Sequence, residues 1–224
     1  FLRHLLGLEQ PLTGNIHLLG QDITKLDGRQ MHSLRRQIGV SFQGGALFNS
    51  MTVGQNVCLP LMEHTDLDES TMKIMARMKL EVVNLAGFED LMPSQLSGGM
   101  IKRAALARAI VMDPRLLFFD EPSAGLDPVV SAELDELILK LRDAMGVTIV
   151  VVTHELDSAF KIADRITFLD RGHILMTGTV EEVKASDNPR IRRLLNRMPE
   201  VEELDPESYL RRLTGRDRVH EENR

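Results

Sequence analysis

Residues 116–122 read Leu-Leu-Phe-Phe-Asp-Glu-Pro, a run of four apolar residues followed directly by two carboxylates. A short apolar run of this kind predicts a strand that is buried on both faces. Side chains alternate along a strand, so Asp120 and Glu121 should point in different directions. Two such carboxylates can divide the work of holding a metal ion and orienting a water molecule. An isolated Asp-Glu pair is more often only a solvated strand end, so the neighbouring segments decide between the two interpretations.

Strand and helix patterns alternate on both sides of this stretch. A helix is expected at residues 1–9, and strands are expected at residues 14–19, 38–42 and 147–152. Residues 130–145 have the pattern of a helix with one apolar face. A hairpin is expected at residues 165–176, around Asp-Arg-Gly. The order strand, helix, strand predicts a parallel sheet with helices on its faces, which makes the chain an α/β protein.

Two further polar residues follow strands of this sheet. Gln43 comes after the strand at residues 38–42, and His154 follows the strand at residues 147–152. The carboxyl ends of parallel strands meet at one edge of a sheet, so both side chains should lie beside Asp120 and Glu121. A lone histidine is more often structural than catalytic, but this placement favours a functional role. The amide of Gln43 can bind Mg²⁺ or water without adding charge.

Residues 96–100, Leu-Ser-Gly-Gly-Met, precede an expected helix that runs to about Met112. Ser97 has the side chain of an N-cap, and Gly98 and Gly99 leave the first N–H groups of the helix unobstructed. Such a helix N-terminus can bind a phosphate. Taken alone, Ser-Gly-Gly before a helix is more often a turn and a cap.

The composition narrows the class of protein further. The chain has 224 residues, a formal net charge of −6 and a single cysteine, Cys58. The acidic balance argues against nucleic-acid binding, which needs a basic face, and one cysteine cannot form an internal disulfide. We expect no signal peptide, and the 224 residues contain no apolar run of the roughly 18 residues that a membrane-spanning helix needs. We therefore expect a cytoplasmic chain without a nucleic-acid partner.

Together these segments resemble the nucleotide-binding domain of ABC transporters. The matching motifs, in chain order, are the Q-loop at Gln43, the signature at residues 96–100, the Walker B strand at 117–120, the catalytic glutamate at Glu121, the D-loop at 123–127 and the switch histidine at His154. The resemblance covers residues 1–185. It implies a P-loop NTPase-like α/β fold, with a mixed or parallel sheet core and a helical subdomain at about residues 52–112. Residues 186–224 are expected to form a charged helical tail, with short helices near 190–197 and 206–214.

The resemblance implies how ATP and Mg²⁺ would be bound. Two copies of the domain would enclose two ATP molecules head to tail. Ser97, Gly98 and Gly99 of each copy would contact the γ-phosphate held by the other copy. Asp120 and Gln43 would bind Mg²⁺.

The remaining motif residues are implied to act in hydrolysis. Glu121 would orient or deprotonate the attacking water, and His154 would contact the γ-phosphate. Asp127 would couple the two sites across the dimer. Closure and hydrolysis would then drive a separate membrane permease.

A narrower resemblance is to the Mla-type (MCE-associated) lipid-transport ATPases. It is carried by residues 42–48, 51–53, 56–57, 60–61, 63–65, 91–93 and 187–190, and by a signature that ends in Met100. It implies phospholipid transport between bacterial membranes, with the chain on the cytoplasmic face of the inner membrane. The permease would bind residues 44–94, and a small regulatory subunit or a partner ATPase would bind the C-terminal tail. The methionines of residues 51–100 are either core filling or part of the permease groove.

The 224 residues contain no Gly-x-x-x-x-Gly-Lys-Ser/Thr motif. In the family this P-loop precedes the helix that here begins at Phe1. We therefore expect a chain that lacks the first strands and the P-loop, binds ATP weakly and is inactive alone, while the full-length protein is an active ATPase. Two alternatives are an interaction subunit without ATPase activity and an ABC ATPase of DNA repair or translation.

Overall fold

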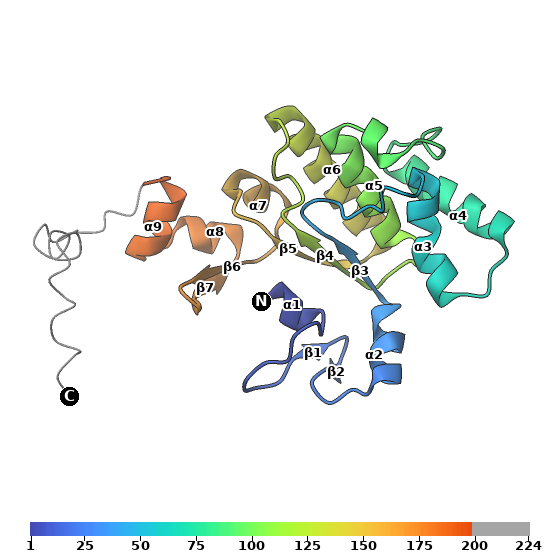
Figure 1. Ribbon diagram of the computed structural model, residues 1–224. Coiled ribbons are helices and arrows are strands. Elements are labelled where there is room, and N and C mark those ends of the chain that lie inside the picture. Colours follow the sequence, from blue (N-terminus) through green and yellow to red (C-terminus); the bar gives the residue numbers. More distant parts are fainter. Residues whose placement is uncertain (199–224) are drawn as a thin grey trace, which may run out of the picture. The chain divides into compact units, whose positions relative to one another are not determined.

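The computed structural model describes residues 1–198, which fall into two compact units (Figure 1). The first unit comprises Phe1–Asp164, and the second begins at Arg165. The boundary between the two units, after Asp164, lies inside the domain predicted at residues 1–185. The extent of that domain therefore stays a prediction. None of the helices within residues 1–198 combines the length and the apolarity that crossing a membrane requires.

The centre of the first unit is a parallel sheet in the order β3-β4-β5. Its strands are β3 (Ile38–Ser41), β4 (Leu116–Asp120) and β5 (Thr148–Val152), all close to the predicted ranges. The register pairs Ser41 with Phe119 and Asp120 with Val152, so the three strands end at the same edge. The parallel α/β arrangement predicted from the sequence is confirmed.

Both faces of β4 are covered, which explains its uninterrupted apolar run. Leu117 and Phe119 belong to the main core, together with side chains of α5 (Gly98–Ile110) and α6 (Pro128–Met145). Leu116 and Phe118 pack on the opposite side with Leu6, which directly follows α1 (Leu2–Leu5). Polar groups therefore enter only where the strand ends, at Asp120 and Glu121.

A helical layer lies beside the sheet, within the range predicted for the helical subdomain. It consists of α3 (Val53–His64), α4 (Glu69–Val82), the 3₁₀ turn η1 (Pro93–Gln95) and α5, and the three α-helices pack on one another. Their N-termini are capped by the side chains of Thr52, Asp68 and Ser97. Among the methionines, Met72, Met75 and Met100 pack against the core, whereas Met62 and Met78 are exposed.

The N-terminal elements are shorter than the sequence suggests. The helix expected at residues 1–9 is confined to α1, because Gly7 takes a positive φ of 62° that ends helical geometry. The strand expected at residues 14–19 is the two-residue β1 (His17–Leu18), which turns at once into β2 (Gln21–Asp22). A basic helix, α2 (Gly28–Arg35), then leads into β3.

The second unit contains the predicted hairpin. The strands β6 (Ile166–Asp170) and β7 (His173–Gly178) are antiparallel, and the turn residues Arg171 and Gly172 both have positive φ, as a type I′ turn requires. Two short helices follow, α8 (Val180–Lys184) and α9 (Pro189–Leu195). The latter corresponds to the helix expected near residues 190–197. The helix expected at residues 206–214 lies outside the described residues.

Candidate active site

The carboxylate of Glu121 lies at the end of β4 and is held by residues that follow β5. The Nδ1 atom of His154 lies 2.8 Å from Oε1 of Glu121. The Thr153 hydroxyl donates to Oε2 at 3.1 Å, and the main-chain N–H of His154 approaches the same oxygen at 3.4 Å. Several donors from one loop therefore fix the orientation of this carboxylate.

Glu121 and His154 differ in the exposure of their side chains and in the part that each takes in their hydrogen bond. The Glu121 side chain is 16% exposed, whereas that of His154 is 74% exposed. An ionised carboxylate only accepts hydrogen bonds, so Nδ1 of His154 carries the proton of the contact. This hydrogen bond, together with the negative charge of Glu121, raises the pKa of the His154 imidazole.

The backbone at Glu121 is turned sharply. Its φ is +50°, in the left-handed region that residues other than glycine rarely adopt. Its N–H donates to the Val152 carbonyl at 2.8 Å, and its own carbonyl accepts from the ammonium of Lys102 at 2.9 Å. The turn ends the strand and brings the Glu121 side chain to Thr153 and His154.

Asp120 and Gln43 lie at the same edge of the sheet. Asp120 is the last residue of β4 and is partly exposed, and Gln43 is exposed two residues after the end of β3. A carboxylate and an amide oxygen suit Mg²⁺, which is usually bound by one or two protein groups, by waters and by phosphate oxygens. The described residues contain no cluster of three or more His, Cys, Asp or Glu that could enclose a metal, so this pair is a partial ligand set.

The signature segment starts α5, as predicted. The Ser97 hydroxyl accepts from the main-chain N–H of Met100 at 3.3 Å, and Ser97 and Gly98 are exposed. A Cβ atom on Gly99 would lie 2.7 Å from Cγ1 of Val130, so the close approach of α6 requires glycine there. Met100 packs against the main core, which explains an apolar residue at the end of the signature.

Asp127 has a clear structural role. Its side chain caps α6 by accepting the main-chain N–H groups of Val129 and Val130, each at 3.1 Å. The hydroxyl of Ser123, also in the D-loop, is buried and has no hydrogen-bond partner within residues 1–198. The coupling role of Asp127 stays a prediction.

Two residues at the site were not predicted, Thr153 and Lys102. Thr153 stands between the apolar strand β5 and His154, so its place in the sequence is a usable signal. Lys102 lies among the buried alanines of α5 and is itself buried, which is unusual for a lysine. Its contacts with the carbonyls of Gln43 and Glu121 join residues far apart in the sequence, and no local pattern shows them.

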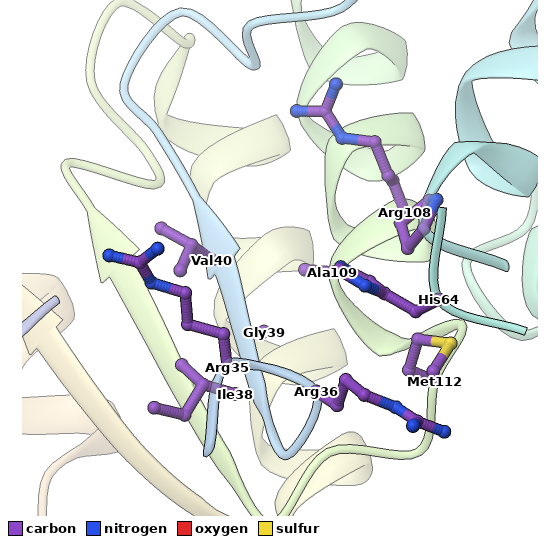
Figure 2. A pocket seen from close by; sticks show the side chains of 10 residues that line it. Arg35, Arg36, Ile38, Gly39, Val40, His64, Arg108, Ala109 and Met112 are labelled. Atoms are coloured by element: carbon purple, nitrogen blue, oxygen red, sulfur yellow. The ribbon is translucent and has the colours of Figure 1, made fainter. Parts of the chain in front are cut away.

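A separate cavity of about 180 Å³ lies beside β3 (Figure 2). Its lining includes Arg35, Arg36, His64 and Arg108, and Figure 2 shows the charged ends of the three arginines pointing in different directions. The Arg108 guanidinium already donates to the carbonyls of Gly45 and Ala46, each at 2.7 Å. The cavity therefore lacks a converging set of donors for an anion.

The parallel sheet, the polar groups at its carboxyl edge and the glycine-rich start of α5 define an ATP-binding cassette. The family described as "ABC transporter" matches residues 1–124, and this chain belongs to that family. The solved dimeric ATP-binding cassette MJ0796, bound to ADP and Pi, is similar to this chain with a TM-score of 0.72 and 30% identity, over 80% of this chain and 78% of that one. The cbiO1 protein of Clostridium perfringens has a TM-score of 0.75 and 28% identity, over 87% and 81%.

Two relatives that are similar in sequence have names that refer to different transported compounds. The "Probable ribonucleotide transport ATP-binding protein mkl" of Mycobacterium leprae is 42% identical over 88% of this chain and 56% of its own length. The "Intermembrane phospholipid transport system ATP-binding protein MlaF" of Escherichia coli K12 is 42% identical over 87% of this chain and 72% of its own length. The chain thus spans little more than half of the mkl relatives and somewhat more of MlaF.

Proposed function

We propose that this chain is the ATP-binding and ATP-hydrolysing subunit of an ABC transporter that moves phospholipid between bacterial membranes. The observation that carries the proposal is the orientation of the Glu121 carboxylate by Thr153 and His154, beside Asp120 at the end of the sheet. A carboxylate held in this way can accept a proton from a water molecule that attacks a phosphate.

The other site residues take complementary roles. Asp120 and Gln43 would hold Mg²⁺, which when bound neutralises charge on phosphate oxygens. His154, hydrogen-bonded to Glu121 through Nδ1, would contact the γ-phosphate with its exposed ring. Ser97 and Gly98 present the open N-terminus of α5 to the γ-phosphate of a second copy.

A second copy of the chain is the first proposed partner. The dimeric form of the similar cassette MJ0796 supports pairing of two copies, for which we propose a head-to-tail arrangement. Asp127, which caps α6, would couple the two sites across that interface.

The permease is the second proposed partner, through residues 44–94. This range carries large apolar side chains that are exposed: Phe48 at 53%, Met62 at 54%, Ile74 at 60% and Met78 at 59%. Exposed apolar side chains of this size are suited to a protein interface. The chain would then act as a peripheral subunit on the cytoplasmic face of the inner membrane. Binding of a regulatory subunit or a partner ATPase to residues 186–224 stays a prediction.

Phospholipid is proposed as cargo over ribonucleotide because the match to MlaF extends over more of the relative's length. The experiment is reconstitution of the full-length subunit with its permease in vesicles. ATP-dependent movement of a fluorescent phospholipid supports the proposal. Movement of a labelled ribonucleotide without lipid movement would overturn the choice of cargo.

A further inference from the structure

The side chain of Lys102 connects three of the motifs at the site. It lies in the second turn of α5, behind the signature, and is 8% exposed. Its ammonium donates to the main-chain carbonyl of Glu121 at 2.9 Å and to that of Gln43. A single buried cation on the signature helix thus holds the backbone just beyond the ends of β3 and β4.

Placing a cation here has an energetic cost that packing alone does not explain. Burial lowers the pKa of the Lys102 ammonium, while the carboxylates of Glu121, Glu155 and Asp120 act in the opposite direction. Residues 104–107 of the same helix are buried and apolar. An apolar side chain of similar volume at position 102 would often be at least as stabilising as a buried charge. The presence of a lysine at position 102 is therefore better explained by the two main-chain carbonyls that its ammonium contacts.

The residue that it contacts has an unusual backbone. Glu121 is held in the left-handed region by its N–H contact with Val152 on one side and by Lys102 on the other. Strained conformations of this kind persist only when the surrounding structure holds them. Without Lys102, the Glu121 carbonyl would keep only the longer contact with the main-chain N–H of Ala124, at 3.3 Å. The direction of the Glu121 carboxylate would then no longer be fixed as firmly.

We propose that Lys102 is a positioning residue for Glu121. Its ammonium fixes the backbone from which the Glu121 carboxylate projects and ties it to the Q-loop carbonyl of Gln43 and to α5. The signature helix, the Q-loop and the carboxylate then keep one relative geometry. This inference rests on the proposed role of Glu121 in activating water.

Arg108 provides a matched comparison on the same helix. It also donates to Q-loop carbonyls, but to those of Gly45 and Ala46. Substitution of Arg108 therefore loosens the Q-loop on α5 while leaving the contact between Lys102 and Glu121. Comparing Lys102 with Arg108 separates anchoring of the loop from positioning of the carboxylate.

The test is steady-state ATP hydrolysis by the full-length subunit assembled with its permease. For Lys102→Met we expect kcat to fall about 10- to 100-fold, because a small displacement of a catalytic group has an effect of this size. The KM for ATP should stay within about twofold, since the lost interaction acts on the transition state. Lys102→Arg should restore most of the rate, because it keeps the charge and the donors. Arg108→Met should lower kcat less than Lys102→Met does.

A double variant, in which Lys102→Met is added to Glu121→Gln, shows whether Lys102 acts through Glu121. In Glu121→Gln, adding Lys102→Met should cause no further loss of the residual rate. An equal further loss there, an unchanged kcat in Lys102→Met alone, or an equal effect of Arg108→Met would overturn the inference. If Lys102→Met does not fold, Lys102→Gln is measured against the same expectations. Wild-type turnover by Glu121→Gln alone would instead overturn the proposed function, so the two failures are distinct.

Discussion

The contact between Glu121 and His154 constrains both side chains. Because Nδ1 donates to the carboxylate, the other ring nitrogen, Nε2, is directed away from Glu121. The histidine can therefore present a second polar atom to a ligand while it holds the carboxylate in place. This arrangement gives one exposed residue two simultaneous contacts at the proposed site.

The protonation of His154 tests this contact directly. The hydrogen bond with Glu121 and the charge of Glu121 raise the pKa of His154, so Glu121→Gln should lower that pKa toward its ordinary value. Titration of the imidazole resonances by NMR measures both values. Equal pKa values in the two proteins would show that the contact does not exist in solution.

The pH dependence of this pair has a defined sign. A folded-state pKa that is raised above the unfolded value, about 6.5, gives stabilisation that is complete below that value. It is lost as the pH rises through the folded-state pKa. Urea unfolding across this range should show a smaller pH dependence for His154→Gln than for the wild type.

The residues of the site were predictable to different degrees. Glu121 and His154 follow apolar strands, and the rule that parallel strands end at one edge places them together. Thr153 required knowledge of which way its hydroxyl points, and the contact of Lys102 spans distant parts of the chain. Residue type and spacing predict that Glu121 and His154 lie together. The contacts of Thr153 and Lys102 depend on tertiary packing, which the sequence pattern does not show.

Among the elements, α6 depends on its N-cap residue, Asp127. Asp127 accepts two N–H groups at the start of this helix. Asp127→Ala should lower the free energy of unfolding by about 0.5–2 kcal/mol, as the loss of an N-cap usually does. Chemical denaturation measures the change.

Asp127→Asn separates the cap from the proposed coupling. Asparagine keeps the capping oxygen but removes the charge, so it should retain most of the stability. A loss of ATPase cooperativity in Asp127→Asn would then be caused by the loss of the proposed contact between subunits and not by the loss of the cap. An equal loss of stability in both variants would contradict the capping role.

The start of α5 is the second element open to a direct test. Ser97→Arg places a long cation where the γ-phosphate of the second copy would enter. We expect ATP-dependent dimerisation of the full-length protein to be lost, while nucleotide binding within each subunit remains. Light scattering with and without ATP checks this, and Ser97→Thr, which keeps a hydroxyl cap, is the control. ATP-dependent dimerisation of Ser97→Arg would contradict the proposed contact with the γ-phosphate and would show that Ser97 only caps α5.

Sequence patterns predicted the buried elements better than the N-terminal ones. The apolar run of β4 and the amphipathic face of α6 report burial directly, whereas β5 has an equally apolar run and is only partly buried. The helix at residues 1–9 was predicted too long, because the positive φ of Gly7 outweighs an apolar pattern over so short a segment. The packing of Gly99 on Val130 is a contact between helices and could not be seen in the sequence.

At the scale of the whole molecule, the first unit carries all of the proposed site residues. Gln43, Ser97, Asp120, Glu121 and His154 lie within Phe1–Asp164, on the sheet and on the helix beside it. The exposed apolar side chains of residues 44–94 belong to the same unit. Nucleotide chemistry and permease binding are thus proposed for the same folded unit.

The most direct test of this account is the rate of phosphate release by the assembled transporter, measured together with lipid movement. Glu121→Gln keeps the size of the side chain but cannot accept a proton, so both rates should fall by about 10²–10⁴. ATP binding, followed with a fluorescent analogue, should be unchanged. Phosphate release at the wild-type rate in Glu121→Gln would contradict the central claim that this carboxylate activates the attacking water.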